Sequence, residues 1–155
     1  MGSGHFSTPI LHKMTQAGGR YLLTSDNNEE WLKKYRFLES KQHRYMKING
    51  RKGNWGEWNT AGDVEKHWGL VLIDHQPGER RRIDVDLLRD RAELIVVHDT
   101  QSHGYKYNFS NFEFKYHDHI KKKLAARTTL LSVKRGDLVN KAKDLIEKAR
   151  SEGIN

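Results

Sequence analysis

The run Gly69-Leu70-Val71-Leu72-Ile73-Asp74 is a continuous apolar segment that stops at a carboxylate. A second run, Glu93-Leu94-Ile95-Val96-Val97-His98-Asp99, has the same form. Strands of a parallel sheet have this pattern because helices cover both faces of the sheet. The two runs therefore predict two buried, parallel strands, each ending in an aspartate.

Strand and helix patterns alternate over most of the chain, which is typical of an α/β fold. We expect Ser7 or Thr8 to cap the first helix, with Pro9 in its first turn. The predicted helices cover residues 8–16, 29–39, 82–90 and 137–150, and the other predicted strands of this region cover 20–25 and 43–49. Residues 50–62, rich in glycine, asparagine and tryptophan, predict a loop.

The pattern changes after Asp99. Aromatic residues partly alternate between Tyr107 and Tyr116, and residues 128–133 alternate as well. We expect these two segments to pair antiparallel, as a C-terminal hairpin. The 155 residues suit one domain, which we divide into a core over 1–136 and a helical tail over 137–155.

Composition and charge limit the class of protein. Hydrophobic residues make up 35% of the chain and charged residues 31%, which indicates a polar globular protein. Cysteine is absent, which excludes disulfides and thiolate metal sites and is compatible with a cytoplasmic location. No apolar run is long enough for a membrane span, and we expect no membrane partner.

The net charge of +8 favours acidic partners, and a nucleic-acid surface is one alternative. The basic residues gather in two short clusters, which we interpret as solvated faces or turn flanks. The clusters are Arg80, Arg81 and Arg82, and Lys121, Lys122, Lys123 and Arg127.

The glycine-rich start Met1-Gly2-Ser3-Gly4 runs directly into the first predicted helix. Glycines let a backbone approach a ligand closely, and a helix N-terminus favours negative charge. Asp26 ends the next predicted strand, where nucleoside sites place an acid that accepts from ribose hydroxyls. We expect this loop and the strand-end residues Asp26, Asp74 and Asp99 to meet in one crevice that binds a nucleoside.

In these features the chain resembles a family, the class I S-adenosylmethionine-dependent methyltransferases with a Rossmann-like sheet. The residues that carry the resemblance lie between Met1 and Val133, and the C-terminal helix lies outside it. They are residues 1–9, Asp26 with Asn27, residues 68–78, residues 95–100 and residues 128–132. The resemblance implies a mostly parallel sheet with helices on both faces and a last antiparallel hairpin.

The resemblance also implies a cofactor, S-adenosyl-L-methionine, and positions that bind it. Gly2, Ser3 and Gly4 would line its methionine end, and Asp26 with Asn27 would hold the ribose. Residues 54–58 would approach the adenine, where Trp55 stacks on the base or serves as a packing anchor.

Asp74 and Asp99 have two functional interpretations. The resemblance implies the first, because some small-molecule O-methyltransferases of this fold hold a divalent metal such as Mg²⁺ with acids at these two strand ends, and the metal lowers the pKa of an acceptor hydroxyl. Alternatively one of them, or His75 or His98, is a general base. A purely structural role, in which both acids cap the turns that follow them, is equally compatible with the sequence. The pair His117 and His119 is interpreted as a polar strand face rather than a metal site.

We therefore predict an enzyme that transfers a methyl group to a small-molecule or biopolymer acceptor. The alternatives are a non-catalytic nucleic-acid-binding protein of the same fold and another nucleotide-cofactor enzyme such as a reductase. In the resembled family a strand precedes the glycines, but Met1 stands where that strand should end. From this we expect an incomplete sequence that binds S-adenosylmethionine weakly or not at all.

Overall fold

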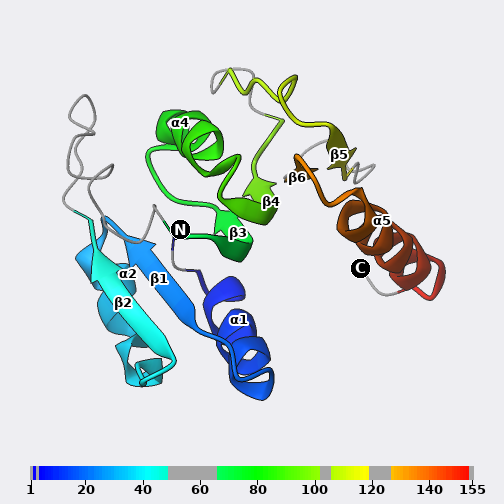
Figure 1. Cartoon of the computed structure of the whole chain (residues 1–155). Helices are drawn as coiled ribbons and strands as arrows, with labels where there is room; N and C mark the ends of the chain where they lie inside the picture. Colours follow the sequence, from blue (N-terminus) through cyan, green and yellow to red (C-terminus); the bar gives the residue numbers. More distant parts are fainter. Residues whose placement is uncertain (1, 3, 49–65, 102–105, 119–126, 154–155) are drawn as a thin grey trace. The chain divides into compact units, whose positions relative to one another are not determined.

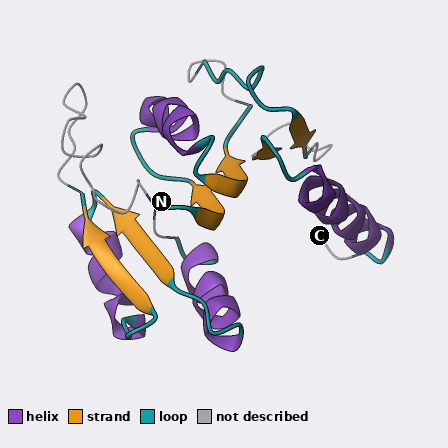
Figure 2. Cartoon of the chain, viewed as in Figure 1, coloured by secondary structure: helices purple, strands orange, loops and turns teal. Residues whose placement is uncertain are grey.

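The computed structural model describes residues 2, 4–48, 66–101, 106–118 and 127–153. The contacts of the backbone divide the chain into two compact units. The first unit comprises residues 1–63 and 74–77, and the second comprises residues 64–73 and 78–155. Each unit contains both helices and strands, so the mixed α/β class predicted from the sequence is confirmed (Figures 1 and 2).

The first unit is built on two parallel strands, β1 (Leu22–Asp26) and β2 (His43–Lys47). The helix α1 (Ser7–Ala17) contacts β1, and α2 (Glu29–Tyr35) contacts both strands (Figure 1). The register aligns Leu22 with His43 and Asp26 with Lys47, so the two strands end together.

The ends of the two helices of the first unit differ from the sequence prediction. The N-cap of α1 is Phe6 and makes no side-chain cap bond, so the predicted cap at Ser7 or Thr8 is wrong. The Thr8 hydroxyl instead accepts a hydrogen bond from Gly4 N at 3.0 Å, which occupies its oxygen with the preceding loop. The second helix was predicted to continue to Glu39, but α2 ends at Tyr35 and a 3-10 turn, η1 (Arg36–Leu38), follows.

The second unit holds a four-stranded sheet in the order β3-β4-β6-β5. The strands β3 (Trp68–Ile73) and β4 (Ala92–His98) are parallel, as the two apolar runs predicted. The prediction that both strands are buried is wrong for the first half of β3, where Leu70 is 45% exposed, because β3 stands at one end of the strand order. The strands β5 (Phe114–His117) and β6 (Thr128–Ser132) pair antiparallel with each other, and β6 pairs antiparallel with β4. The antiparallel pairing expected after Asp99 is present, and most of the segment that joins its two strands lies outside the described residues.

The helix α4 (Gly78–Leu88) contacts β3 and β4, and α5 (Gly136–Ser151) contacts β5 and β6. The start of α4 lies four residues before the predicted Arg82, directly after Pro77. The core of this unit is formed by aliphatic side chains of β3, α4, β4 and β6, together with Phe112: Val71, Ile73, Val85, Leu88, Ile95, Val97, Phe112 and Leu131 are all buried.

The interpretation of Arg80 and Arg81 as part of a solvated face is wrong. Both residues are 1% exposed, because each has an acidic partner inside the fold. Arg80 pairs with Asp84 one helical turn away at 2.9 Å, and Arg81 pairs with Asp99 beyond β4 at 3.1 Å. The earlier start of α4 places both arginines within the helix.

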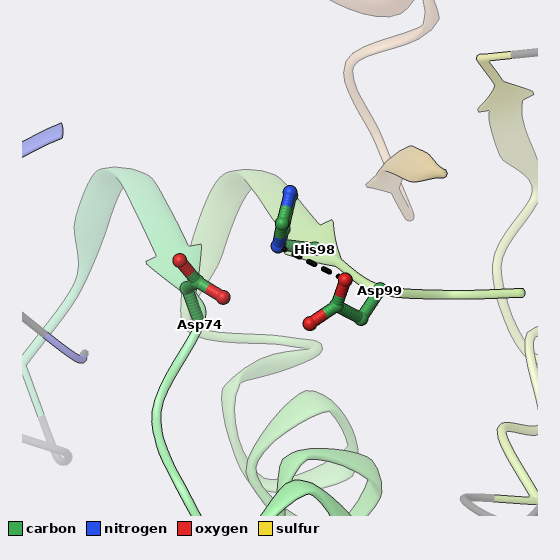
Figure 3. Close-up of side chains that lie close together, drawn as sticks. All are labelled: Asp74, His98 and Asp99. Carbon is green, nitrogen blue, oxygen red and sulfur yellow. Dashed lines mark ion pairs between the residues drawn. The ribbon is translucent and has the colours of Figure 1, made fainter. Parts of the chain in front are cut away.

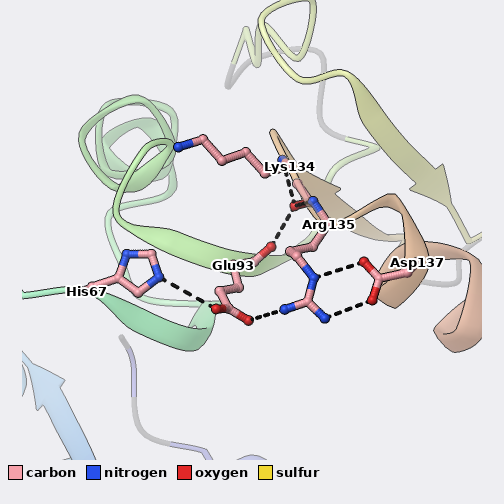
Figure 4. Close-up of polar contacts among 6 residues, drawn as sticks. His67, Glu93, Lys134, Arg135 and Asp137 are labelled. Carbon is pink, nitrogen blue, oxygen red and sulfur yellow. Dashed lines mark hydrogen bonds and ion pairs between the residues drawn. The ribbon is translucent and has the colours of Figure 1, made fainter.

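Polar contacts attach α5 to the sheet. The Arg135 guanidinium lies between the Glu93 carboxylate at 2.8 Å and the Asp137 carboxylate at 2.7 Å (Figure 4). The Ser132 hydroxyl donates to the Glu93 carbonyl at 2.6 Å and accepts from the Arg135 N–H at 2.9 Å. Because Glu93 belongs to β4 and Arg135 is the N-cap residue of α5, these bonds place the start of the helix against the sheet.

Candidate functional site: an acid–histidine cluster at two strand ends

The ends of β3 and β4 bring three potential ligands together. The parallel register pairs Ile73 with Val97, so the residues that follow these two partners are neighbours. Each of three residues, Asp74, His98 and Asp99, offers one ligand atom, and these three atoms lie within 4.8 Å of one another (Figure 3). All three residues are half-buried. Of the residues predicted to meet in one crevice, Asp74 and Asp99 are both members of this cluster. His98, weighed from the sequence only as an alternative base, belongs to the same cluster.

Asp99 adopts a backbone conformation that non-glycine residues seldom take, with φ = 57°. Aspartate tolerates this region better than most residues do. The turn aims the carboxylate back toward the strand end, where Asp99 Oδ1 lies 3.4 Å from His98 Nδ1. Unusual backbone conformations of this kind cluster at functional sites.

Arg81 holds the turn at Asp99 in place. Its Nη1 atom donates to the His98 carbonyl at 2.9 Å and to Asp99 Oδ2 at 3.1 Å. One oxygen of Asp99 is thereby bound to a buried cation, while the other faces His98. Sequence reasoning missed this residue, although Arg80 and Asp84, four positions apart on one helix face, were a signal that this basic run is not wholly solvated.

The glycine segment of the first unit packs tightly at the end of β1. Gly2 N donates to the Ser25 carbonyl at 2.8 Å, and Gly2 has φ = +89°. A Cβ atom added to Gly2 would lie 2.8 Å from the backbone of Asp74 and His75, in the same unit. Only glycine fits this position, because both the conformation and the space exclude a side chain.

Asp26 ends β1 as predicted, and it is 6% exposed. Its Oδ1 atom accepts from Asn28 N at 2.8 Å, and Asn28 in turn caps α2 by accepting from Glu30 N and Trp31 N. Part of the role of Asp26 is therefore to shape the turn into α2. The neighbouring Asn27 is half-buried.

Several other residues singled out from the sequence take different places. His75 is 1% exposed and is not part of the acid–histidine cluster. His117 lies on β5, with its Nδ1 2.9 Å from the Thr129 hydroxyl, as expected for a polar strand face. Ser3, Trp55, the remainder of residues 54–58 and His119 lie outside the described residues.

None of the described helices is long and apolar enough to cross a membrane. No protein-family model matches the chain, and neither the curated proteins nor the solved structures contain a significant match. The site must therefore be interpreted from its own geometry.

Proposed function

We propose that this chain transfers the methyl group of S-adenosyl-L-methionine to a nucleophilic acceptor, and that Asp74, His98 and Asp99 activate that acceptor. The observation that carries the proposal is the cluster itself. Two carboxylates and an imidazole lie together just beyond two parallel strands, which is where ligands of open α/β sheets bind.

The cofactor half of the proposal rests on the first unit. Gly2 approaches Ser25 and the backbone at Asp74 and His75 without a side chain, and the buried Asp26 lies next to Ser25 at the end of the same strand. This combination suits a nucleoside whose ribose binds a carboxylate. The proposal includes a Rossmann-like fold, supported by the two sets of parallel strands.

In the proposed reaction an acceptor X–H loses its proton to His98, and Asp99 beside Nδ1 stabilises the imidazolium that forms. The electron pair on X forms the new bond to the methyl carbon. The carbon–sulfur bond breaks, and its electrons remain on sulfur. The cluster acts on the acceptor only, since sulfonium is already a good leaving group and positioning supplies much of the rest.

A divalent metal ion also fits the cluster, because Arg81 occupies only Oδ2 of Asp99. Asp74, His98 and Asp99 would hold the ion, and a bound ion would lower the pKa of an acceptor hydroxyl. Two carboxylates and an imidazole suit Mn²⁺ or Zn²⁺ better than Mg²⁺, which prefers oxygen ligands.

The nucleic-acid alternative is weakened by the burial of Arg80 and Arg81. Two of the charges counted toward a basic surface are instead neutralised by Asp84 and Asp99.

The test is a titration of the protein with S-adenosylhomocysteine. Binding is monitored by NMR chemical shifts, which detect even millimolar affinities. Shifts should concentrate at Gly2, Gly4 and the end of β1. Asp26→Ala should weaken binding by about 1.5–3 kcal/mol, the cost of a lost charged hydrogen bond. The matched control is Glu30→Ala, an exposed acid of the same unit that pairs with Lys33 on the surface.

Absence of saturable shifts with S-adenosylhomocysteine would overturn the proposal. Saturable shifts at the same residues with NAD instead would favour another nucleotide-cofactor enzyme.

A further inference from the structure

A buried histidine of the first unit joins two strands and a helix. His43 of β2 is 0% exposed. Its Nε2 lies 2.9 Å from the Thr24 hydroxyl of β1, and its Nδ1 lies 2.9 Å from Nδ1 of His12, on α1. Tyr45 packs beside the ring, with centroids 4.4 Å apart. Side chains of three elements thus meet at His43.

The contact between the two Nδ1 atoms can hold only one proton. At 2.9 Å one nitrogen must donate and the other must accept, so at least one of the two rings is neutral. If both rings were protonated, two N–H groups and two positive charges would face each other. The contact therefore persists with zero or one added proton on the pair and breaks with two.

The surroundings of His43 oppose its protonation. Burial, followed by the charge of His12, lowers its pKa to about 4, while Glu39 acts in the opposite direction. The other groups around it are the hydroxyl of Thr24 on β1, Tyr45 on β2 and, beyond Tyr45, Tyr35 on α2. Glu39 is the carboxylate that acts on His43 among the described residues, and it does not reverse the effect of burial.

We propose that the His12–His43 contact is a proton-sensitive latch that fastens α1 to the β1–β2 sheet, closed when the pair carries at most one added proton and open when it carries two. The latch does not depend on the proposed function. Release of α1 would nevertheless disturb the glycine segment of the proposed cofactor site, because α1 follows that segment directly and Gly4 N is bonded to Thr8 in the first turn of α1.

The direction of the pH effect follows from linkage. When α1 detaches, His43 becomes exposed, and its pKa returns toward the usual value of about 6.5. The folded pKa is lower, so the latch contributes fully above about 6.5 and loses its contribution as the pH falls toward about 4. Within this window detachment takes up one proton, and its equilibrium constant rises by up to about tenfold per pH unit.

The test combines two NMR measurements on the whole chain. The first is the titration of the His43 ring. The second is hydrogen exchange of the α1 amides between pH 7.5 and 5, expressed as protection factors so that the pH dependence of the intrinsic exchange rate is removed. The latch predicts that protection of α1 falls with pH toward a tenfold loss per unit, and that the His43 ring titrates well below the usual histidine pKa of about 6.5.

Two variants separate the latch from a general loss of stability. His43→Gln cannot titrate, so protection of α1 should become independent of pH. In His12→Gln the amide carbonyl can accept from a protonated His43, so the His43 pKa should rise and the pH dependence should shrink while the ring stays buried. His67→Gln, at an exposed histidine of the second unit, is the matched control and should leave both measurements as in the parent chain.

Protection of α1 that is independent of pH in the parent chain would overturn the latch. The same holds if His12→Gln leaves both the His43 titration and the pH dependence unchanged. The second result remains informative even where His43→Gln fails to fold.

Discussion

Arg81 Nη1 donates both to the carbonyl of His98, at 2.9 Å, and to the carboxylate of Asp99, at 3.1 Å. One side chain of α4 thereby holds the end of β4 and the carboxylate that follows it. Because Asp99 has a positive φ, this clamp maintains a backbone conformation that would otherwise be costly. The geometry of the acid–histidine cluster depends on a residue outside it.

Replacing the Arg81 side chain should destabilise the protein. Arg81→Met should lower the free energy of unfolding by about 2–3 kcal/mol, less than the roughly 3–5 kcal/mol of a wholly buried pair, because Asp99 remains 30% exposed. Urea denaturation measures the effect. Arg82→Met, at the exposed neighbouring position, is the control and should change stability by less than about 0.5 kcal/mol. Equal effects of the two variants would show that the clamp contributes nothing.

The acid–histidine cluster makes a prediction about metal. If it binds a divalent ion, calorimetry with Mn²⁺ should give a saturable signal, and Asp74→Asn or Asp99→Asn should weaken affinity by about tenfold or more. Asp86→Asn, an exposed acid of α4, should leave the affinity unchanged. A chelator should then abolish methyl transfer, and added metal should restore it. Turnover that resists the chelator would instead leave His98 as a general base.

Gly2 should not tolerate a side chain. Gly2→Ala combines an unfavourable φ with a Cβ placed 2.8 Å from the backbone of Asp74 and His75, so S-adenosylhomocysteine binding should be lost. Gly19→Ala separates the two effects. Gly19 also has a positive φ, but no atom lies within 4 Å of an added Cβ, so only the conformational cost of about 1 kcal/mol should remain. Unimpaired binding by Gly2→Ala would remove the glycine segment from the proposed site.

Gly136 provides a test of packing in the second unit. A Cβ at this position would lie 2.5 Å from Cε1 of Phe114, so Gly136→Ala should destabilise the protein by about 1–3 kcal/mol as the ring is displaced. Gly69→Ala is the matched control, since an added Cβ there meets nothing within 4 Å. Thermal unfolding of the two variants measures the difference, and a neutral Gly136→Ala would mean that Phe114 moves aside at no cost.

The elements whose patterns are local could be predicted from the sequence. The apolar runs at 69–74 and 93–99 predicted β3 and β4, each followed by an aspartate, because a buried parallel strand must be apolar on both faces. The helical spacing near the N-terminus and near the C-terminus predicted α1 and α5 to within a few residues. The convergence of Asp74 and Asp99 followed from the same rule, since parallel strands end at one edge of a sheet.

The sequence did not reveal which polar side chains are buried or which partners they have, because this depends on how the chain packs. From the sequence alone Arg81 is interpreted as a solvated cation. In the structure the pairing of β3 with β4 brings Asp99, 18 positions later, beside it. His12 and His43 are 31 positions apart, and no periodicity links them. A local pattern records which face of an element is apolar. The partner of a buried charge depends on how distant segments pack, because the cost of burial is offset only by a specific contact across the fold.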